Sequence, residues 1–465
     1  MWVRAYISAV AGLLGGAILG MGCSGASADT LEWAIVQAYQ NNPSLNSQRA
    51  ALRVVDENVP QALSGYRPKL SLTGNGGYNY TNATQLFPTA GQVHFGETFY
   101  SRTFGATASQ TLFNGFQNAN KTRQAESQVD AARETLRVTE QQVLLDAATA
   151  YMNLLRDGAI LELNQSNVQV LTEQLKQTRD RFNVGEVTRT DVAQSESRLA
   201  AGRSALLGAQ SNYVTSQANY RRVIGVDPGK LAPATSVDRL SPNTLPKAIT
   251  QGQALNPSVL AAMYGVDVAE LAVKISEGAL YPNLAVVASA SYGVQPAFET
   301  VKETAASVLG QLTIPIYQGG AEYSTIRQSK ETVGQQRLTL DTNRDQARAT
   351  VVQSWGQLDA AKAQIESTTA QVNSAEIALN GVREEARVGQ RTTLDVLNAQ
   401  QELVNARVAF VTAQHDRVVA SYTLLAAVGA LSMPKLGLNV AVYDPMVHYQ
   451  QVRDAWIGVR IPDGR

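Results

Sequence analysis

Cysteine, histidine and net charge are all scarce in this chain of 465 residues. Its single cysteine, Cys23, leaves no partner for a disulfide and no set of thiolates for a metal. The three histidines, His94, His415 and His448, lie far apart, and no two have the spacing of zinc ligands. Basic and acidic residues both number 39 and are mixed along the chain, which offers nucleic acid no basic surface. We therefore expect no metal, no cofactor and no nucleic-acid partner.

Long apolar runs are also missing beyond the N-terminus. Residues 1–28 are predicted to be a signal peptide, because Arg4 is basic, residues 5–21 are apolar and Ala26-Ser27-Ala28 fits the cleavage rule. Lipid attachment at Cys23 is the alternative. No later run reaches about 18 apolar residues. Any membrane crossing therefore has to be made by β-strands, which satisfy their backbone polar groups in lipid only as a closed barrel.

The chain contains an internal duplication. One group of landmarks recurs 204 residues apart, pairing Val184-Gly185 with Val388-Gly389, Asp191 with Asp395, Tyr151 with Trp355 and Gly225 with Gly429. A second group recurs 214 residues apart, pairing Asn42-Pro43 with Asn256-Pro257 and Pro68 with Pro282. We predict two repeats, residues 29–235 and 236–432, followed by a tail of residues 433–465. Two units of this size indicate one pseudo-twofold protomer, whereas a solenoid needs at least three shorter units.

Each repeat is predicted to contain a helix, two strands and two long helices. Asn-Pro marks a helix start, and Pro68 or Pro282 ends the helical pattern. Apolar alternation typical of strands follows, most clearly at Leu284, Val286, Ala288, Ala290 and Tyr292. In the first repeat the strands are expected at residues 70–80 and 99–113, and its ten extra residues are expected in a surface loop within residues 81–100.

Strand length and aromatic placement suit a bilayer. Two strands of about 10–14 residues per repeat match a tilted crossing. Aromatic residues gather near the strand ends, as they do at membrane interfaces: Tyr78, Tyr80, Phe99, Tyr100, Tyr292 and Tyr317. Four strands cannot close a barrel alone, so partner chains must cover the sheet edges.

A seven-residue apolar spacing runs through the segments that follow the strands. The second repeat carries it at Leu358, Ile365, Val372 and Leu379, and on the return at Leu397, Val404, Val411, Val418 and Leu425. Such spacing indicates coiled-coil-like packing. Residues 119–182 contain no clear breaker and would span about 95 Å as a helix. The predicted fold is a mixed α/β membrane protein with four strands and a tunnel of long helices.

Two motifs carry a resemblance to a known family. Arg181-Phe182-Asn183-Val184-Gly185 followed by Thr190-Asp191-Val192 resembles the first helix–turn–helix tip of the TolC-like outer-membrane factor family. Val388-Gly389-Gln390-Arg391-Thr392 followed by Leu394-Asp395-Val396-Leu397 resembles the second. The stretch Thr30-Leu31-Glu32-Trp33-Ala34, ahead of Asn41-Asn42-Pro43, is similar to that family as well. The resemblance covers about residues 30–431.

The resemblance implies an assembly. It implies a homotrimer whose strands form a 12-strand barrel in outer-membrane lipid, above a periplasmic helical tunnel. It implies a periplasmic adaptor protein at the tips, and an inner-membrane ABC transporter or proton-driven pump. The tail, through Tyr443-Asp444-Pro445 and His448-Tyr449, resembles members that serve type I secretion. A passive conduit for protein secretion is therefore the predicted function. Drug or metal efflux is the alternative, and a periplasmic coiled-coil tether is the alternative of another class.

The resemblance also points to a gate. Asp191 and Asp395 lie just past the tip glycines, and rings of carboxylates at a narrow mouth favour cations. By resemblance, Asp395 and Arg391 match the aperture groups of the family. Asn398 stands where the family can have another aspartate, and Ala386 where it can have an aromatic partner. A less acidic mouth is therefore expected.

A structural role competes with the gate. Thr188 with Asp191, and Thr392 with Asp395, have the spacing of helix N-caps with an acid three residues on. Aspartate in a first turn also favours the helix dipole. Gly185 and Gly389 are predicted turn residues. With Val184 and Val388 beside them, they are by resemblance the docking points of the adaptor. No triad or phosphate-binding loop is recognisable, so no enzyme is expected.

Overall fold

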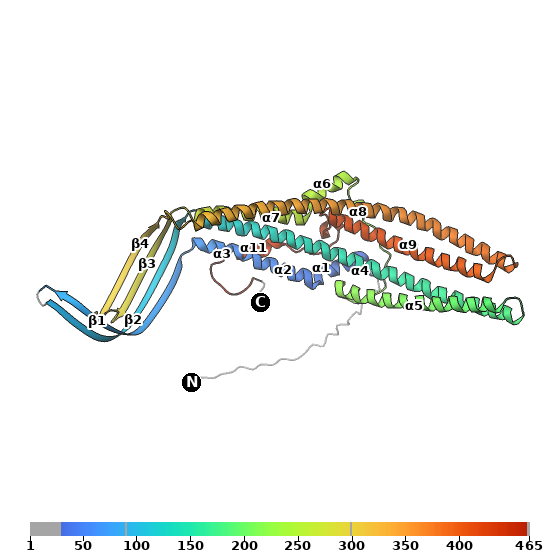
Figure 1. Cartoon of the computed structure of the whole chain (residues 1–465), viewed down its shortest axis with the longest axis horizontal. Helices are drawn as coiled ribbons and strands as arrows, with labels where there is room; N and C mark the ends of the chain where they lie inside the picture. The colour runs from blue at the N-terminus through green and yellow to red at the C-terminus, as the bar shows by residue number, and fades with distance from the viewer. Residues whose placement is uncertain (1–28, 89–90, 298–299, 463–465) are drawn as a thin grey trace, which may run out of the picture.

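The computed structural model describes residues 29–88, 91–297 and 300–462, and the predicted signal peptide with Cys23 lies outside this part. The molecule is elongated, with a four-stranded sheet at one end and two helical hairpin tips at the other (Figure 1). The order of helix, two strands, long helix and returning helix occurs twice, in keeping with the duplication. The boundaries of the two repeats and of the tail stay predictions.

The elements of the two copies correspond closely. The first copy contains α1 (Leu31–Asn41), α2 (Pro43–Asp56), α3 (Asn58–Leu63), η1 (Ser64–Tyr66), β1 (Lys69–Phe87), β2 (Gly91–Asn114), α4 (Gln117–Asn183) and α5 (Arg189–Ile224). After η2 (Asp238–Leu240), the second contains α6 (Leu245–Leu255), α7 (Pro257–Gly278), β3 (Asn283–Val294), β4 (Lys302–Thr313), α8 (Ala321–Arg387) and α9 (Thr393–Ala427). The tail adds α10 (Met433–Leu436) and α11 (Pro445–Val452).

The two long helices have equal length. Helices α4 and α8 contain 67 residues each, so each extends about 100 Å. Each pairs with a returning helix, α5 or α9. One buried cluster contains Leu175 on α4, Leu199 on α5 and Leu397 on α9, so it connects the two helical hairpins. Within the described ranges, no helix combines the length and the apolar character that crossing a bilayer requires.

The four strands form one antiparallel sheet in chain order. Its register places residues of similar polarity in rows that run across all four strands. One row joins Leu70, Ala108, Ala288 and Val308. The adjacent row joins Ser71, Thr107, Ser289 and Ser307. Because successive side chains of a strand point to opposite faces, the sheet has an apolar face and a hydroxyl-bearing face.

Two details of the strands differ from the sequence-based prediction. Strands β1 and β2 stay paired from Lys69↔Ser109 out to Phe87↔Gly91, so the predicted loop within residues 81–100 is wrong and the extra residues prolong a hairpin. Polar residues do not interrupt the hydrogen bonds between two strands when both faces of the hairpin are exposed to water. Threonine and tyrosine, which occur in this segment, also favour strands. The apolar spacing of Val308, Leu312, Ile314 and Ile316 predicts a return strand that includes all four residues. Strand β4 instead ends at Thr313, before Ile314.

The Asn-Pro motifs join helices end to end. Asn42 caps α2 by accepting from Ser44 N at 2.9 Å, and its amide nitrogen donates to Val223 O, at the end of α5, at 3.1 Å. Asn256 makes the same pair of bonds, to Ser258 N at 2.9 Å and Ala427 O at 3.1 Å. The start of α2 therefore meets the end of α5, and α7 meets α9 likewise. Opposite ends of the helix dipoles face each other at both junctions.

The largest core cluster lies at these junctions, in the middle of the molecule. It includes the fully buried Tyr151, Tyr220 and Leu425. The Tyr151 hydroxyl lies 2.7 Å from Asp29 O and 2.6 Å from Ala232 O, which fastens the start of the described chain to the segment between the two copies. Burial raises the pKa of Tyr151 to about 12, so this hydroxyl stays protonated and able to donate at neutral pH.

A buried histidine on α9 predicts a loss of stability in mild acid. His415 contacts Asn153 Oδ1 and Asp416 Oδ1, each at 2.8 Å. Burial lowers the pKa of His415 below its ordinary 6.5. Below pH 6.5 His415 therefore binds a proton in the unfolded chain but not in the native protein. The free energy of unfolding then decreases as the pH is lowered. Urea unfolding should show that the free energy of unfolding decreases less between pH 7.5 and pH 5.5 for His415→Gln than for the parent protein. His94→Gln, at an exposed site on β2, is the control and should retain the full loss.

Candidate functional site

The two hairpin tips end in equivalent glycine turns. Gly185 and Gly389 have φ of +80° and +81°, a conformation that glycine adopts without strain. Val184 and Val388 beside them are 72% and 71% exposed. A Cβ on either glycine would meet no atom within 4 Å. The four residues predicted from the repeat thus form the open end of the molecule, where the side chains of Val184 and Val388 are exposed.

The two aspartates each close a capping box. Thr188 N and Oγ1 donate to Asp191 Oδ2 at 2.9 and 2.6 Å, at the start of α5. Thr392 N and Oγ1 donate to Asp395 Oδ2 at 3.0 and 2.8 Å, at the start of α9. The predicted capping role is therefore confirmed for both residues.

The same bonds keep both carboxylates charged. The Thr188 hydroxyl, followed by the Thr188 backbone N–H, lowers the pKa of Asp191. The Thr392 backbone N–H, followed by its hydroxyl, lowers the pKa of Asp395. Since hydrogen bonds to the ionised form favour it, both tips retain their negative charge to lower pH than a free aspartate would.

Each tip also contains an internal ion pair. Arg391 Nε donates to Glu385 Oε2 at 2.8 Å in the second tip. Arg181 Nε donates to Glu186 Oε2 at 3.0 Å in the first. The hydrogen bond from Arg391 to Glu385 raises the pKa of the arginine further. Arg391 is thus engaged within its own hairpin, and the structure does not bring it into contact with Asn398.

Polar contacts link the two hairpins to each other. Arg198 on α5 donates from Nη2 to Asn398 Oδ1 on α9 at 2.6 Å. Deeper between the hairpins, Arg383 on α8 donates to Gln400 Oε1 at 2.9 Å, and Gln400 Nε2 donates to Asn167 Oδ1 on α4 at 3.4 Å. We name the two contacts that join the hairpins, Arg198–Asn398 and Gln400–Asn167, the hairpin links. Sequence reasoning found Asn398 but not its partner Arg198, which carries no local signal.

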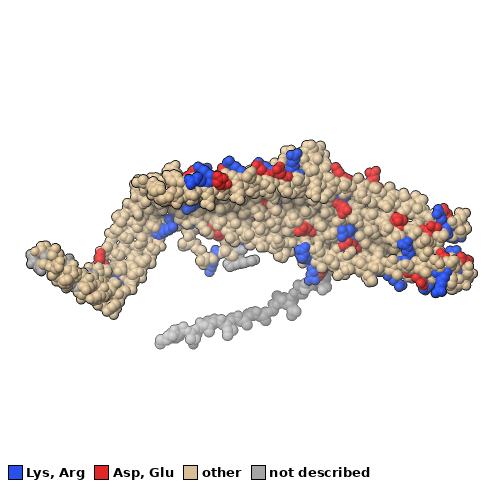
Figure 2. Space-filling model, in the orientation of Figure 1, with Lys and Arg blue, Asp and Glu red and all other residues tan. Residues whose placement is uncertain are grey.

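A groove lies between the two hairpins at this end. Both tips contribute to its lining, which is rich in charge: Arg181, Glu186, Arg383, Glu384, Arg387 and Arg391. Figure 2 shows basic and acidic side chains together at the tips, whereas the face of the sheet seen in this view carries few charges. The two ends of the molecule therefore offer very different surfaces, one suited to polar contacts and the other to an apolar medium.

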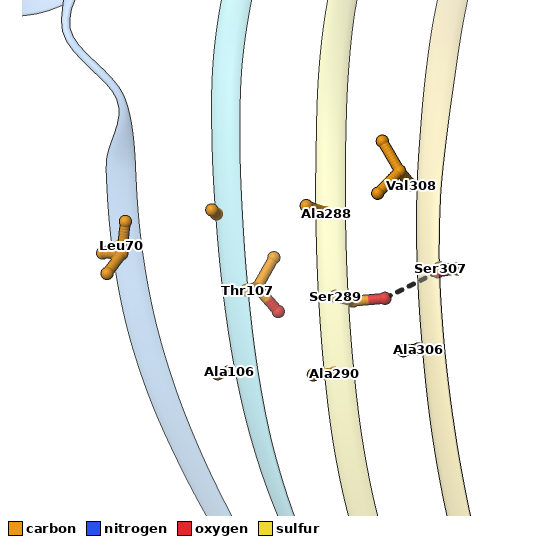
Figure 3. Close-up of a pocket in the computed structure, with 10 residues that line it drawn as sticks. Leu70, Ala106, Thr107, Ala288, Ser289, Ala290, Ala306, Ser307 and Val308 are labelled. Carbon is orange, nitrogen blue, oxygen red and sulfur yellow. Dashed lines mark hydrogen bonds between the residues drawn. The ribbon is translucent and has the colours of Figure 1, made fainter.

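The apolar face of the sheet is hollowed where its side chains are small. The hollow is lined mostly by residues of the apolar rows (Figure 3): Leu70, Ala106, Ala108, Ala288, Ala290, Ala306 and Val308. Thr107, Ser289 and Ser307 of the row between them also contribute. On the opposite face, the Ser289 and Ser307 hydroxyls lie 2.8 Å apart (Figure 3). A sheet that is apolar on one face and hydroxyl-bearing on the other suits a wall between lipid and water.

A sheet with these two faces, continued by helices about 100 Å long, defines an export channel that lies in the outer membrane and reaches into the periplasm. The chain belongs to the outer membrane efflux protein family, whose model matches residues 34–226 and again residues 248–430. Each match falls in one of the two predicted repeats. The predicted resemblance, mixed α/β fold and outer-membrane location are thereby confirmed. Membership also makes the chain a channel protein and not an enzyme.

Particular relatives cover most of the chain. The outer membrane efflux protein BepC of Brucella suis biovar 1 (strain 1330) is 42% identical over 446 residues, covering 95% of this chain and 94% of that protein. The outer membrane protein TolC of Escherichia coli (strain K12) is 25% identical over 456 residues, covering 92% and 89%. The alkaline protease secretion protein AprF of Pseudomonas aeruginosa is 25% identical over 382 residues, covering 80% and 79%.

A solved structure shows the same fold. The Campylobacter jejuni CmeC outer membrane channel superposes with a TM-score of 0.77 at 15% identity, covering 91% of this chain and 89% of that one. The likeness extends over both the sheet and the long helices, since less than a tenth of this chain lies outside it.

Proposed function

We propose that this chain is the outer-membrane duct of a tripartite export machine and that it works as a homotrimer. The observation that carries the proposal is the sheet, whose two faces differ in polarity and whose edge strands β1 and β4 each have one side unpaired among the described residues. Three copies give 12 strands, and closure leaves no edge open. The hydroxyl face then lines the lumen, and the apolar face meets lipid.

The machine needs two further partners. A passive duct does not drive transport, so an inner-membrane ABC transporter or proton-driven pump supplies the energy. A periplasmic adaptor protein connects that pump to the tips. The exposed Val184 and Val388, beside Gly185 and Gly389, and the charged groove behind them are the surfaces we assign to the adaptor.

Conductance tests the duct. A purified trimer in a planar bilayer should pass ions, and a tether would pass none. Size-exclusion chromatography with light scattering should give three copies per particle in detergent. A monomer that stays folded and soluble without detergent would contradict the proposal, because its sheet edges and apolar face would then need no cover.

Small-molecule efflux is the cargo class we favour, and protein secretion is the second candidate. The relative of 42% identity is an efflux protein by name. Secretion is supported by the tail residues Tyr443-Asp444-Pro445, which resemble secretion members, and by the likeness to AprF at 25% identity. Deleting the gene separates the two. Efflux predicts raised sensitivity to drugs or metals and an unchanged set of secreted proteins. Secretion predicts unchanged sensitivity and the loss of one or more secreted proteins.

The tips are proposed to form the gate. In the trimer, Asp395 lines the periplasmic mouth together with Asn398, and the hairpin links hold the two hairpins of each protomer in place. Asn398 contributes a neutral acceptor to Arg198, so the mouth carries fewer charges than a ring with two acids per chain. Arg391 remains paired with Glu385, and Asp191 serves mainly as a cap on the other hairpin.

Removing one carboxylate per chain tests this arrangement. Asp395→Ala should raise single-channel conductance and weaken block by multivalent cations, because three charges leave the narrowest ring. Asp191→Ala is a matched control, since it removes an equivalent capping box at the other tip. Both variants should lower the melting temperature by a similar amount, because the two capping boxes are equivalent. Equal conductance changes in both variants would reduce Asp395 to its capping role.

A further inference from the structure

The end of the chain exposes large apolar side chains. Beyond α11, Trp456, Ile457 and Val459 are 68%, 96% and 102% exposed. Ile461 follows, half exposed. Figure 1 shows the chain running from α11 toward the sheet and then curling back. A short segment with this many large apolar residues facing outward marks an interaction site, because single exposed residues are common but contiguous ones are not.

Arg67 fixes where this segment lies. Its Nη1 donates to Ala455 O at 2.6 Å, and its guanidinium lies 4.7 Å from the centroid of the Trp456 ring. Arg67 follows η1, and β1 begins two residues later at Lys69. The indole is therefore held at the level where the helices end and the sheet begins.

That level is one edge of the apolar band of the sheet. From Leu70 to Tyr80, β1 rises about 33 Å, and the usual tilt of barrel strands reduces this to the ~25 Å height of a membrane-facing band. Tyr78, Tyr80 and Tyr100 mark the far edge. At the near edge, exposed residues just outside the strands form a second girdle: Tyr66, Tyr281, Ile316 and Tyr317. Trp456 joins this second girdle.

We propose that residues 455–461 are a lipid anchor separate from the barrel. Trp456, Ile457 and Val459 enter the periplasmic leaflet of the outer membrane, at the boundary between headgroups and acyl chains, and Arg67 holds them there. Tryptophan prefers this boundary because its ring is apolar and its N–H is polar. Arg460, between Val459 and Ile461, stands where a basic side chain meets lipid phosphate. The proposal depends on the outer-membrane location and not on the cargo or the gate.

Continuity with the sheet favours lipid over a neighbouring protomer. The segment is held beside the first residues of β1, whose apolar face begins at Leu70, so both surfaces reach the same medium at the same height. By contrast, α11 lies farther from the membrane. His448 Nδ1 on α11 contacts Asp56 Oδ2 at 2.9 Å, and Asp56 precedes Arg67 by a helical stretch of about 16 Å.

Spin labelling of the trimer in nanodiscs tests the anchor. A nitroxide on Ile457→Cys is compared with one on Val447→Cys, which is 52% exposed on α11. Each is probed with oxygen, which concentrates in lipid, and with a water-soluble nickel chelate. The protein without an introduced cysteine is the control for background labelling. Chromatography confirms that each labelled variant remains a trimer.

The anchor predicts high oxygen and several-fold lower nickel accessibility at position 457 than at position 447. High nickel accessibility at both positions would mean a tail in water and would overturn the proposal. Low accessibility to both reagents at position 457 would mean burial against another protomer and would overturn it as well. An Arg67→Gln variant should raise nickel accessibility at 457 if the guanidinium holds the segment at this depth. None of these readouts depends on conductance, so they stand apart from the test of the duct.

Discussion

Replacing Ala288 by arginine is expected to abolish assembly in the outer membrane. Ala288 is near the middle of β3, on the apolar face, between Ala108 and Val308. An arginine on the lipid face near the bilayer midplane costs about 2–4 kcal/mol, and a trimer carries three of them. The combined cost of about 6–12 kcal/mol is comparable to the whole stability of a domain. Heat-modifiable trimers in outer-membrane fractions should therefore be lost.

The neighbouring residue supplies the control. Ser289 shares the strand but belongs to the opposite row, with its hydroxyl near that of Ser307. Ser289→Arg places the same charge toward the lumen, so trimers should form in normal amount and conductance should shift toward anions. If Ser289→Arg prevented assembly and Ala288→Arg did not, the two faces of the sheet would have been assigned the wrong way round.

A methyl group at Gly429 should also have a large effect. Gly429 follows α9 with φ of +75°, and a Cβ there would lie 2.7 Å from Leu255 C and 2.8 Å from Asn256 Cα. Backbone atoms cannot move aside as a flexible side chain can. The left-handed conformation costs an alanine about 1–2 kcal/mol, and forced repacking adds about 1–3 kcal/mol. Gly429→Ala should therefore lower the melting temperature strongly and reduce the yield of trimers.

Two other glycines serve as controls that distinguish the steric contact at Gly429 from the cost of the left-handed backbone conformation. Gly225→Ala occupies the equivalent place after α5, with φ of +90°, but its Cβ would meet only Asn41 Cβ, at 3.7 Å. Gly389→Ala has open space around it. Both should show the conformational cost alone, about 1–2 kcal/mol. A melting temperature for Gly429→Ala no lower than that of Gly225→Ala would argue against close contact at the α7–α9 junction.

Local signals predicted a large part of the architecture. Thr392 and Asp395 are three residues apart on one chain segment, so their capping box follows from sequence alone. The duplication supported the second copy of every element, and the seven-residue spacing predicted helices of this length. The sequence does not predict the full length of β1 and β2, because polar residues favour loops in general, although an extended hairpin tolerates them where water surrounds it.

Contacts between distant segments could not be predicted in the same way. Arg198 and Asn398 are 200 residues apart, and no spacing rule connects them. Asn42 was correctly predicted as a helix start, but its bond to Val223 depends on how the two helices meet. The lowered pKa values of Asp191 and Asp395 depend on hydrogen bonds from threonines three residues away, and this local spacing can be recognised in the sequence. The hairpin links depend on how distant helices pack, which the sequence does not show.

The end-to-end helix junctions have a mechanical consequence. Helices α5 and α9 stop at Gly225 and Val428, while their partners α4 and α8 continue without interruption toward the sheet. Each returning helix is therefore a lever arm of about 54 Å that can pivot at its own junction. At that length, a rotation of one degree moves the tip by about 1 Å. An aperture could widen by several ångströms through small rotations that leave the strands undisturbed.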